Sequence, residues 1–217
     1  MPQKRDAAGP RAPSLGEQLA TWSPTASELV EDAVFERRSV RDAKLEGVVT
    51  ARLTLDRVRL EGVSLSGAEL SSVRLDDVAF ERCDLASIRF GKGTWTRIAL
   101  RSCRSTGAQL IDLRLDDVAF DECTAAYSVF QGTRFRRVTF RACALREVSF
   151  ESCSTANVVF EDCDLTGASF STTSLAGAEF RGCNLEGVRL GARDATGMTI
   201  DDLQAVNVVR ALGVLVK

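Results

Sequence analysis

Hydrophobic residues recur at every fifth position along most of the chain. Of the 34 positions taken in steps of five from Phe35 to Ile200, 31 are apolar, and they include all eleven phenylalanines. A second series two positions earlier, from Ala33 to Met198, is apolar at 28 of 34 positions and holds all seven cysteines. A helix repeats near every 3.6 residues and a strand every 2, so neither element alone explains a period of five.

An inward, outward, inward pattern followed by two outward residues predicts short extended pieces joined by corners. Glycine recurs at the second outward position, for example at Gly47, Gly107 and Gly187, where a missing Cβ favours a turn. Six cysteines from Cys83 to Cys183 are spaced by 20 residues, and "RLDDVAF" at 74–80 returns at 114–120. We therefore expect coils of four pentapeptides over 33–200, stacked ~4.8 Å apart like neighbouring strands around an apolar interior.

Several five-residue units follow the loose motif A(D/N)LXX. They include "CDLAS" at 83–87, "CDLTG" at 163–167, "LAGAEF" at 175–180 and "CNLEG" at 183–187. On these units the sequence resembles the pentapeptide repeat family. The resemblance implies an all-β solenoid, a right-handed quadrilateral parallel β-helix of about eight coils, in which the centre of each repeat and its second predecessor point inward.

The two ends of the repeat region need covering, because a solenoid otherwise exposes unpaired backbone. We expect residues 1–13 to form a disordered tail and 14–32 a short helical cap, with capping boxes at Ser14–Glu17 and Thr25–Glu28.

Residues 201–217 are expected to form a C-terminal helix and tail, with Gly213 as the helix stop. One helical stripe could cover the last coil or pair with a second copy. In proteins of the resembling family such a helix commonly joins two rods, which implies a head-to-head homodimer. The stripe consists of Leu203, Val206, Val209 and Leu212.

Composition argues against a catalytic or membrane role. The net charge of −2 gives no global attraction to nucleic acid or to an anionic membrane, and no stretch has the length of a signal peptide or a spanning helix. We therefore expect a cytoplasmic location.

The chain has no histidine, which removes the commonest general base and metal ligand, and cysteines in a straight ladder cannot converge on zinc. We expect seven free thiols, no metal, no cofactor and no enzymatic activity.

Two functional hypotheses remain. The first is a non-catalytic protein-interaction scaffold whose partner the sequence does not identify. Its candidate contact patch consists of the outward apolar residues Ile111, Tyr127 and Val129. The basic stretch 133–146 lacks outward aromatic residues for base stacking and has acidic residues one coil below, so direct nucleic-acid binding is not expected.

The alternative comes from the resemblance. Some pentapeptide repeat proteins imitate a DNA duplex, bind the type II topoisomerase DNA gyrase and protect it from quinolone-like inhibitors. In this chain, however, the charge at each corner changes sign from coil to coil, an arrangement that favours stacking but interrupts an acidic stripe. The candidate acidic corner residues are Asp76, Asp77, Asp116, Asp117, Asp121, Glu122, Glu161 and Asp162.

Overall fold

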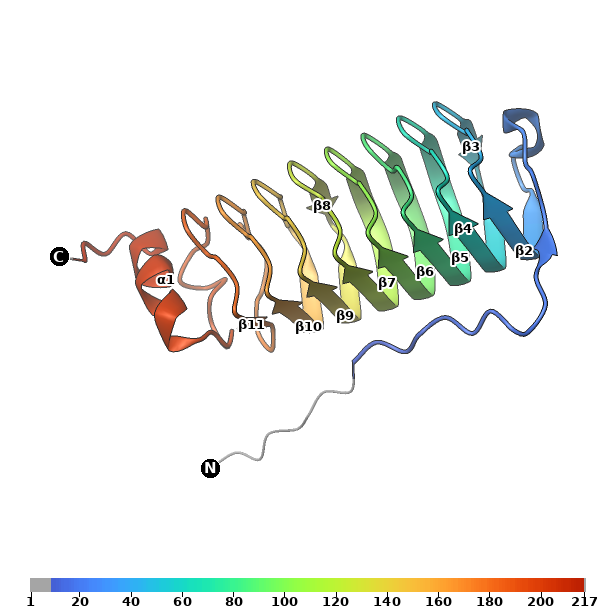
Figure 1. Cartoon of the computed structure of the whole chain (residues 1–217). Coiled ribbons are helices and arrows are strands. Elements are labelled where there is room, and N and C mark those ends of the chain that lie inside the picture. Colours follow the sequence, from blue (N-terminus) through green and yellow to red (C-terminus); the bar gives the residue numbers. More distant parts are fainter. Residues whose placement is uncertain (1–8, 217) are drawn as a thin grey trace.

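The computed structural model of the chain describes residues 9–216, which form a rod of stacked coils (Figure 1). All strand pairs are parallel, and neighbours in the sheet come from successive coils. The strands are β1 (Ala20–Thr21), β2 (Val34–Arg41), β3 (Val49–Ala51), β4 (Thr54–Glu61), β5 (Glu69–Glu81), β6 (Arg89–Arg101), β7 (Gln109–Asp121), β8 (Val129–Gln131), β9 (Arg134–Arg141), β10 (Ser154–Glu161) and β11 (Glu179–Arg181).

The register between successive coils is 20 residues. In the β5–β6 pair Phe80 lies opposite Leu100, and in the β6–β7 pair Leu100 lies opposite Phe120. Isolated bridges carry the same offset along another side of the rod, from Lys44–Ser64 onward. The predicted solenoid of about eight coils is therefore confirmed, and the two "RLDDVAF" copies lie two coils apart in β5 and β7.

A corner of left-handed backbone follows each short extended piece from Asp32 to Gly187. Asp77, Tyr127 and Gly107, all two positions after a repeat centre, have φ values of 53°, 59° and 68°. Because this corner recurs every five residues and the register is 20, each coil has four sides. Many corners carry a residue other than glycine, and Asp and Asn are the types that tolerate this conformation best.

The interior is a column of packed apolar side chains with repeated aromatic stacking. The rings of Phe120, Phe140, Phe160 and Phe180 follow one another at centroid separations of 4.6, 5.0 and 4.9 Å. Stacking at this distance matches the coil spacing and adds to the free energy of burial. The backbone periodicity thus places like side chains on top of one another along the rod.

Two irregular positions in the sequence fit into this regular interior. A Cβ built on Gly93 would lie 2.5 Å from the Val73 carbonyl oxygen, so the close approach of the neighbouring coil at this position requires glycine. The small repeat centres Ser105 and Ala125, one coil apart, cause no bulge, because the Arg104–Thr124 and Thr124–Ala144 bridges keep the 20-residue register.

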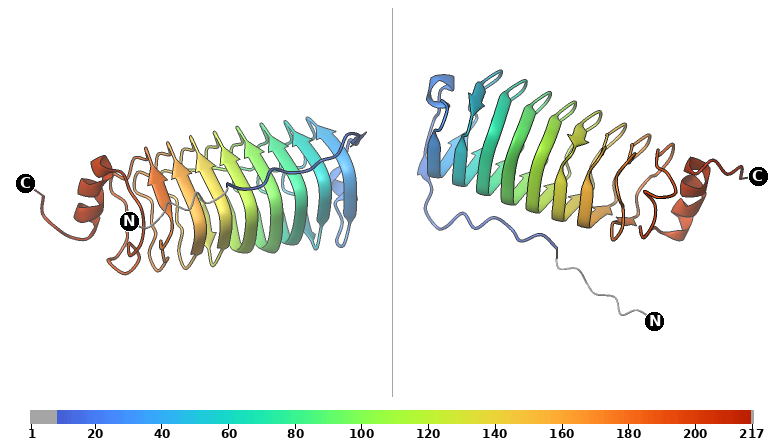
Figure 2. Two further views of the ribbon diagram at one scale, coloured as in Figure 1. Left: turned by 90° about the horizontal axis from the view of Figure 1, so that it is seen from below. Right: turned by 180° about the vertical axis from the view of Figure 1, so that it is seen from behind.

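The N-terminal segment differs from the helical cap expected over 14–32. Residues 9–19, here called the strap, run extended along the rod (Figure 2) and lead into β1, which pairs with β2. No helix begins at Ser14, whose N–H donates instead to Asp77 Oδ1 at 2.8 Å. A capping box does form at Thr25–Glu28, on the 3-10 helix η1 (Ala26–Glu28). Residues 1–8 of the predicted disordered tail lie outside the described residues, whereas residues 9–13 belong to the strap, where Arg11 binds Asp117.

The C-terminal end carries a 3-10 turn η2 (Asp202–Gln204) and the helix α1 (Ala205–Ala211). Gly213, with φ of 81°, ends it as the sequence predicted, and the Val214 N–H donates to the Val209 carbonyl at 3.2 Å. No helix within residues 9–216 has the length and apolar character needed to cross a membrane.

Candidate interaction surfaces

Ion pairs between successive coils occupy the corners where acidic residues were singled out. Arg97 binds Asp77 through two nitrogens at 2.7 Å each and also reaches Asp76. Arg137 binds Asp117 at 2.6 and 2.7 Å. The predicted alternation of charge along the stack is thus realised as direct contacts between one coil and the next.

Three of the other acidic candidates also face an arginine of a neighbouring coil, and two do not. Asp116 pairs with Arg136, Asp121 lies 3.8 Å from Arg101, and Glu161 accepts from Arg141 at 2.8 Å. Glu122 and Asp162 are the exposed members of the set, and Glu122 accepts from the Ser102 hydroxyl at 3.2 Å. The corners therefore present alternating charges rather than a continuous acidic surface.

Asp117 is the most completely enclosed of these carboxylates, with no exposed side-chain surface. Hydrogen bonds from Arg137 lower its pKa well below the usual range, burial opposes this, and the side chain and N–H of Arg11 lower it further. At Asp77 burial acts to raise the pKa, but Arg97 and the Ser14 N–H outweigh it, so that pKa is also lowered. Both carboxylates are therefore held ionised by their donors.

The candidate apolar patch lies on adjacent coils. Tyr127 stands at a corner with 66% of its surface exposed, whereas Ile111 and Val129 are half-buried. In the β7–β8 ladder Val129 lies opposite Gln109 and Ile111 opposite Gln131, so the two aliphatic side chains sit diagonally, two positions apart. Of the three predicted patch residues, Tyr127 is therefore the one whose side chain is most exposed to solvent.

The stripe predicted on the C-terminal helix faces away from the coils. Leu203 is 94% exposed, and Val206 and Leu212 are also exposed, while Val209 is half-buried. The side that covers the last coil is formed instead by the buried Val208 and Gln204. Gln204 Nε2 donates to the Cys183 carbonyl at 2.9 Å, and its Oε1 accepts from the Asp201 N–H.

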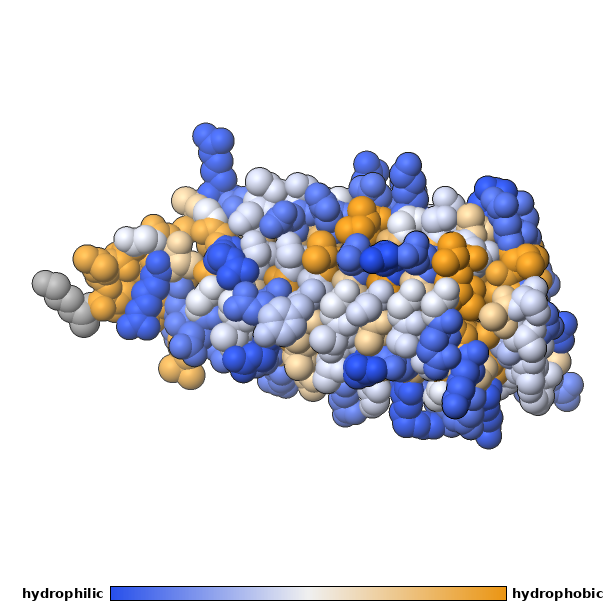
Figure 3. Space-filling model, turned by 90° about the horizontal axis from the view of Figure 1, so that it is seen from above, coloured by the Kyte–Doolittle hydropathy of each residue, from blue (hydrophilic) through white to orange (hydrophobic). Residues whose placement is uncertain are grey.

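The apolar surface of this end extends into the tail. Val214, Leu215 and Val216 are exposed and continue the surface of α1. Figure 3 shows hydrophobic residues gathered over this end of the rod. The stripe predicted from the sequence is exposed, and pairing through it stays a prediction. The side of the helix that meets the coils is the one with Gln204, whose capping box with Asp201 was the signal available in the sequence.

The seven cysteines are free and buried, as the sequence predicted. Most of the thiols donate to a carbonyl 23 residues earlier, for example Cys143 to Phe120 at 3.3 Å and Cys153 to Phe130 at 2.9 Å. Thr133 makes the same contact to Leu110 at 3.0 Å. Burial raises the pKa of Cys153 to about 12. These thiols are hydrogen-bonded core groups, and within residues 9–216 no cluster suited to a metal ion forms.

Two family models match the repeat region. One described as a pentapeptide repeat region matches residues 73–147 and 133–208, and one described as pentapeptide repeats in eight copies matches residues 52–90. Together with the 20-residue register and the corners every five residues, these matches show that the chain belongs to the pentapeptide repeat family. The search of curated proteins returned no match.

Three solved structures of similar proteins share 20% or less of their sequence with this chain. Full-length QnrB1, a plasmid-mediated fluoroquinolone resistance protein, is 20% identical, with 84% of this chain and 100% of that chain covered and a TM-score of 0.36. HetL, involved in heterocyst differentiation regulation in the cyanobacterium Nostoc, is 18% identical, with 79% and 86% covered and a TM-score of 0.31. Rfr23 from the cyanobacterium Cyanothece is 12% identical, with 75% and 91% covered and a TM-score of 0.20.

Proposed function

We propose that the protein is a non-catalytic interaction rod that pairs end to end with a second copy and presents its sides to a protein partner. The observation that carries this proposal is the apolar C-terminal end. Six apolar side chains are exposed there, namely Leu203, Val206, Leu212, Val214, Leu215 and Val216. A terminal cap of a solenoid that remains monomeric is expected to have a polar outer face, because an apolar face associates in water.

The test replaces one residue that has no role inside the rod. Leu203→Glu is expected to convert a dimer into a monomer in sedimentation analysis without changing the unfolding midpoint, because Leu203 is almost wholly exposed. Val30→Glu, at an exposed valine of the opposite end, is the matched control and should leave the mass unchanged. A wild-type protein that sediments as a monomer would refute pairing through this end.

The candidate partner surface on the side of the rod is centred on Tyr127. Aromatic residues contribute a large share of the energy at protein interfaces, and this one is exposed at a rigid corner. Tyr127→Glu is expected to reduce capture of a protein partner by at least tenfold. The mass of the rod in solution should stay the same, since the patch is remote from α1, and unchanged capture would remove Tyr127 from the interface.

Imitation of a DNA duplex for DNA gyrase is the second candidate function. The elongated shape favours it, but an imitation of phosphate rows requires unpaired acidic corners. Here Asp77 and Asp117 are bound by arginines of the next coil. The decisive assay is gyrase supercoiling with and without a quinolone: inhibition or protection at low micromolar protein would support this function, and no effect on either would reject it.

A further inference from the structure

The strap is attached to the rod at two carboxylates. Arg11 donates to Asp117 Oδ2 through Nε at 2.9 Å and an Nη at 2.8 Å, and its backbone N–H reaches Oδ1 at 3.2 Å. Three residues later the Ser14 N–H donates to Asp77 Oδ1 at 2.8 Å. Figure 2 shows the segment crossing the coils lengthwise. An extended peptide is therefore already seated on this face of the solenoid.

The spacing of these contacts follows from the geometry of the coils. Asp77 and Asp117 belong to one corner column and are 40 residues, or two coils, apart. Two coils at strand spacing rise ~9.6 Å, and three residues of extended chain cover ~10 Å. A peptide lying along the axis thus brings residues i and i+3 to successive acidic corners and passes over Arg97 between them.

The floor under the strap is built of small side chains. Ala79 and Ala99 occupy outward positions of β5 and β6, yet both are only 8% exposed. Ala12, Pro13 and Leu15 border a cleft with these alanines, and its edges carry charged residues of neighbouring coils. Small outward residues let a second backbone approach the coils closely. The edge residues are Arg59, Glu81 and Arg101.

The two receptor carboxylates are also held by contacts within the solenoid. Asp117 is bound by Arg137 and Asp77 by Arg97, and neither arginine belongs to the strap. The Arg11 side chain, by contrast, is 66% exposed, so its contact with Asp117 competes with water. The site is therefore preformed, and its occupant is held by few contacts.

We infer that this face is a binding site for an extended, arginine-bearing peptide of a partner protein, and that the strap is its built-in occupant. The ligand presents a guanidinium to Asp117, small or proline residues over Ala99, and a backbone N–H to Asp77 three positions later. The strap competes with it at the millimolar effective concentration typical of a short tether. This inference rests on the proposed function only in assuming that the rod binds a protein. The face under the strap is separate from α1, through which the rods are proposed to pair.

Fluorescence anisotropy with a labelled peptide of residues 9–16, GPRAPSLG, tests this site in the full-length chain. Arg11→Ala should bind the peptide more tightly than the wild type, by up to about fivefold, because the competing strap is weakened. Arg146→Ala removes an exposed arginine paired with Asp164 at another corner and should leave the affinity unchanged. The same peptide with its arginine replaced by alanine should bind more weakly, by up to about fivefold.

Two further variants in the Arg11→Ala background test the receptor side. Asp117→Asn should abolish peptide binding, and Ala99→Glu should do so as well by filling the floor from an outward position. The second variant keeps the test decisive if Asp117→Asn fails to fold. Equal affinity of the wild type and Arg11→Ala for the peptide, or full binding by Ala99→Glu, would overturn the inference, whereas the mass in solution reports separately on pairing through α1.

Discussion

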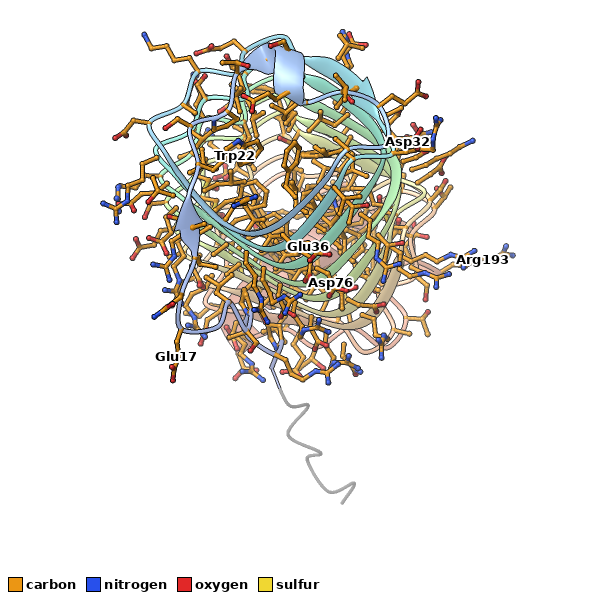
Figure 4. All side chains as sticks on the ribbon, turned by 90° about the vertical axis from the view of Figure 1, so that its right-hand side faces the viewer. Glu17, Trp22, Asp32, Glu36, Asp76 and Arg193 are labelled. Carbon is orange, nitrogen blue, oxygen red and sulfur yellow. The ribbon has the colours of Figure 1, made fainter. Side chains whose placement is uncertain are left out.

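At the N-terminal end of the rod Trp22 stacks on Phe35 with ring centroids 4.1 Å apart, and the buried Leu29 completes the cover. Figure 4 looks onto this end and shows Trp22 directed inward, while Glu17 points away from the rod. At the C-terminal end Val208 and Gln204 face the last coil, and the outer side of the helix is apolar. The two ends thus differ in what they present to solvent.

This difference shows that two covers of one solenoid can have outer surfaces of different polarity. Three large apolar residues are exposed near the first coil, namely Val30, Val34 and Val49, against six at the other end. Both ends bury apolar side chains on the terminal coil, so both act as covers. The C-terminal cover alone combines this with a broad apolar outer surface, which is the basis for proposing pairing there.

The largest effect is expected from removing the N-terminal cover. Trp22→Ala should lower the free energy of unfolding by about 3 kcal/mol, at the low end for a Trp-to-Ala change because Trp22 is only partly buried. Urea denaturation followed by circular dichroism measures this. Val30→Ala, in the same segment but exposed, should change stability by less than about 0.5 kcal/mol. Equal effects of the two substitutions would show that Trp22 does not cover the core.

A smaller effect is expected at the C-terminal cover. Val208→Ala removes two buried methyl groups and should cost about 1.5 kcal/mol, with faster amide exchange in the coil beneath α1. Val206→Ala, on the outward side of the same helix, is the control for stability and should be nearly neutral. If Val206→Ala were the more destabilising of the two, the orientation of the helix described here would be wrong.

The smallest effect concerns the strap, which ties the N-terminal end to the middle coils. The folded-state pKa of Asp117 is lowered, so its stabilising contribution is complete above its unfolded value of about 3.9 and is lost as pH falls through the folded value. Arg11→Ala should reduce stability by less than about 1 kcal/mol, and by the same amount at pH 7 and pH 4, because Asp117 is ionised in the folded protein at both. Urea unfolding at both pH values measures the cost, and a cost that disappears at pH 4 would contradict the linkage.

The periodic part of the molecule was predictable because each contact repeats a local rule. Phe80, Leu100 and Phe120 share one column because their spacing equals the coil length. The alternation of Asp77, Arg97, Asp117 and Arg137 likewise predicted ion pairs between coils, and these form.

The candidate surfaces were predictable only in part. The helical stripe containing Leu203 was recognised, but its direction depends on whether that side or the side with Val208 makes the better fit to the last coil. Ser14 and Glu17 matched a capping box, and the local pattern favoured a helix. The Ser14 N–H is instead bound by Asp77, 63 residues away, which no local pattern encodes.

By itself, the amino-acid sequence determined the solenoid, its coil length, its inward residues and its alternating corners, because a side chain in a repeat meets its own equivalents one coil away. Only the tertiary structure decided where the aperiodic ends lie. The contact between Arg11 and Asp117 joins residues 106 positions apart, and the outward face of α1 results from docking on the last coil. Such contacts form between surfaces that exist only once the coils have stacked.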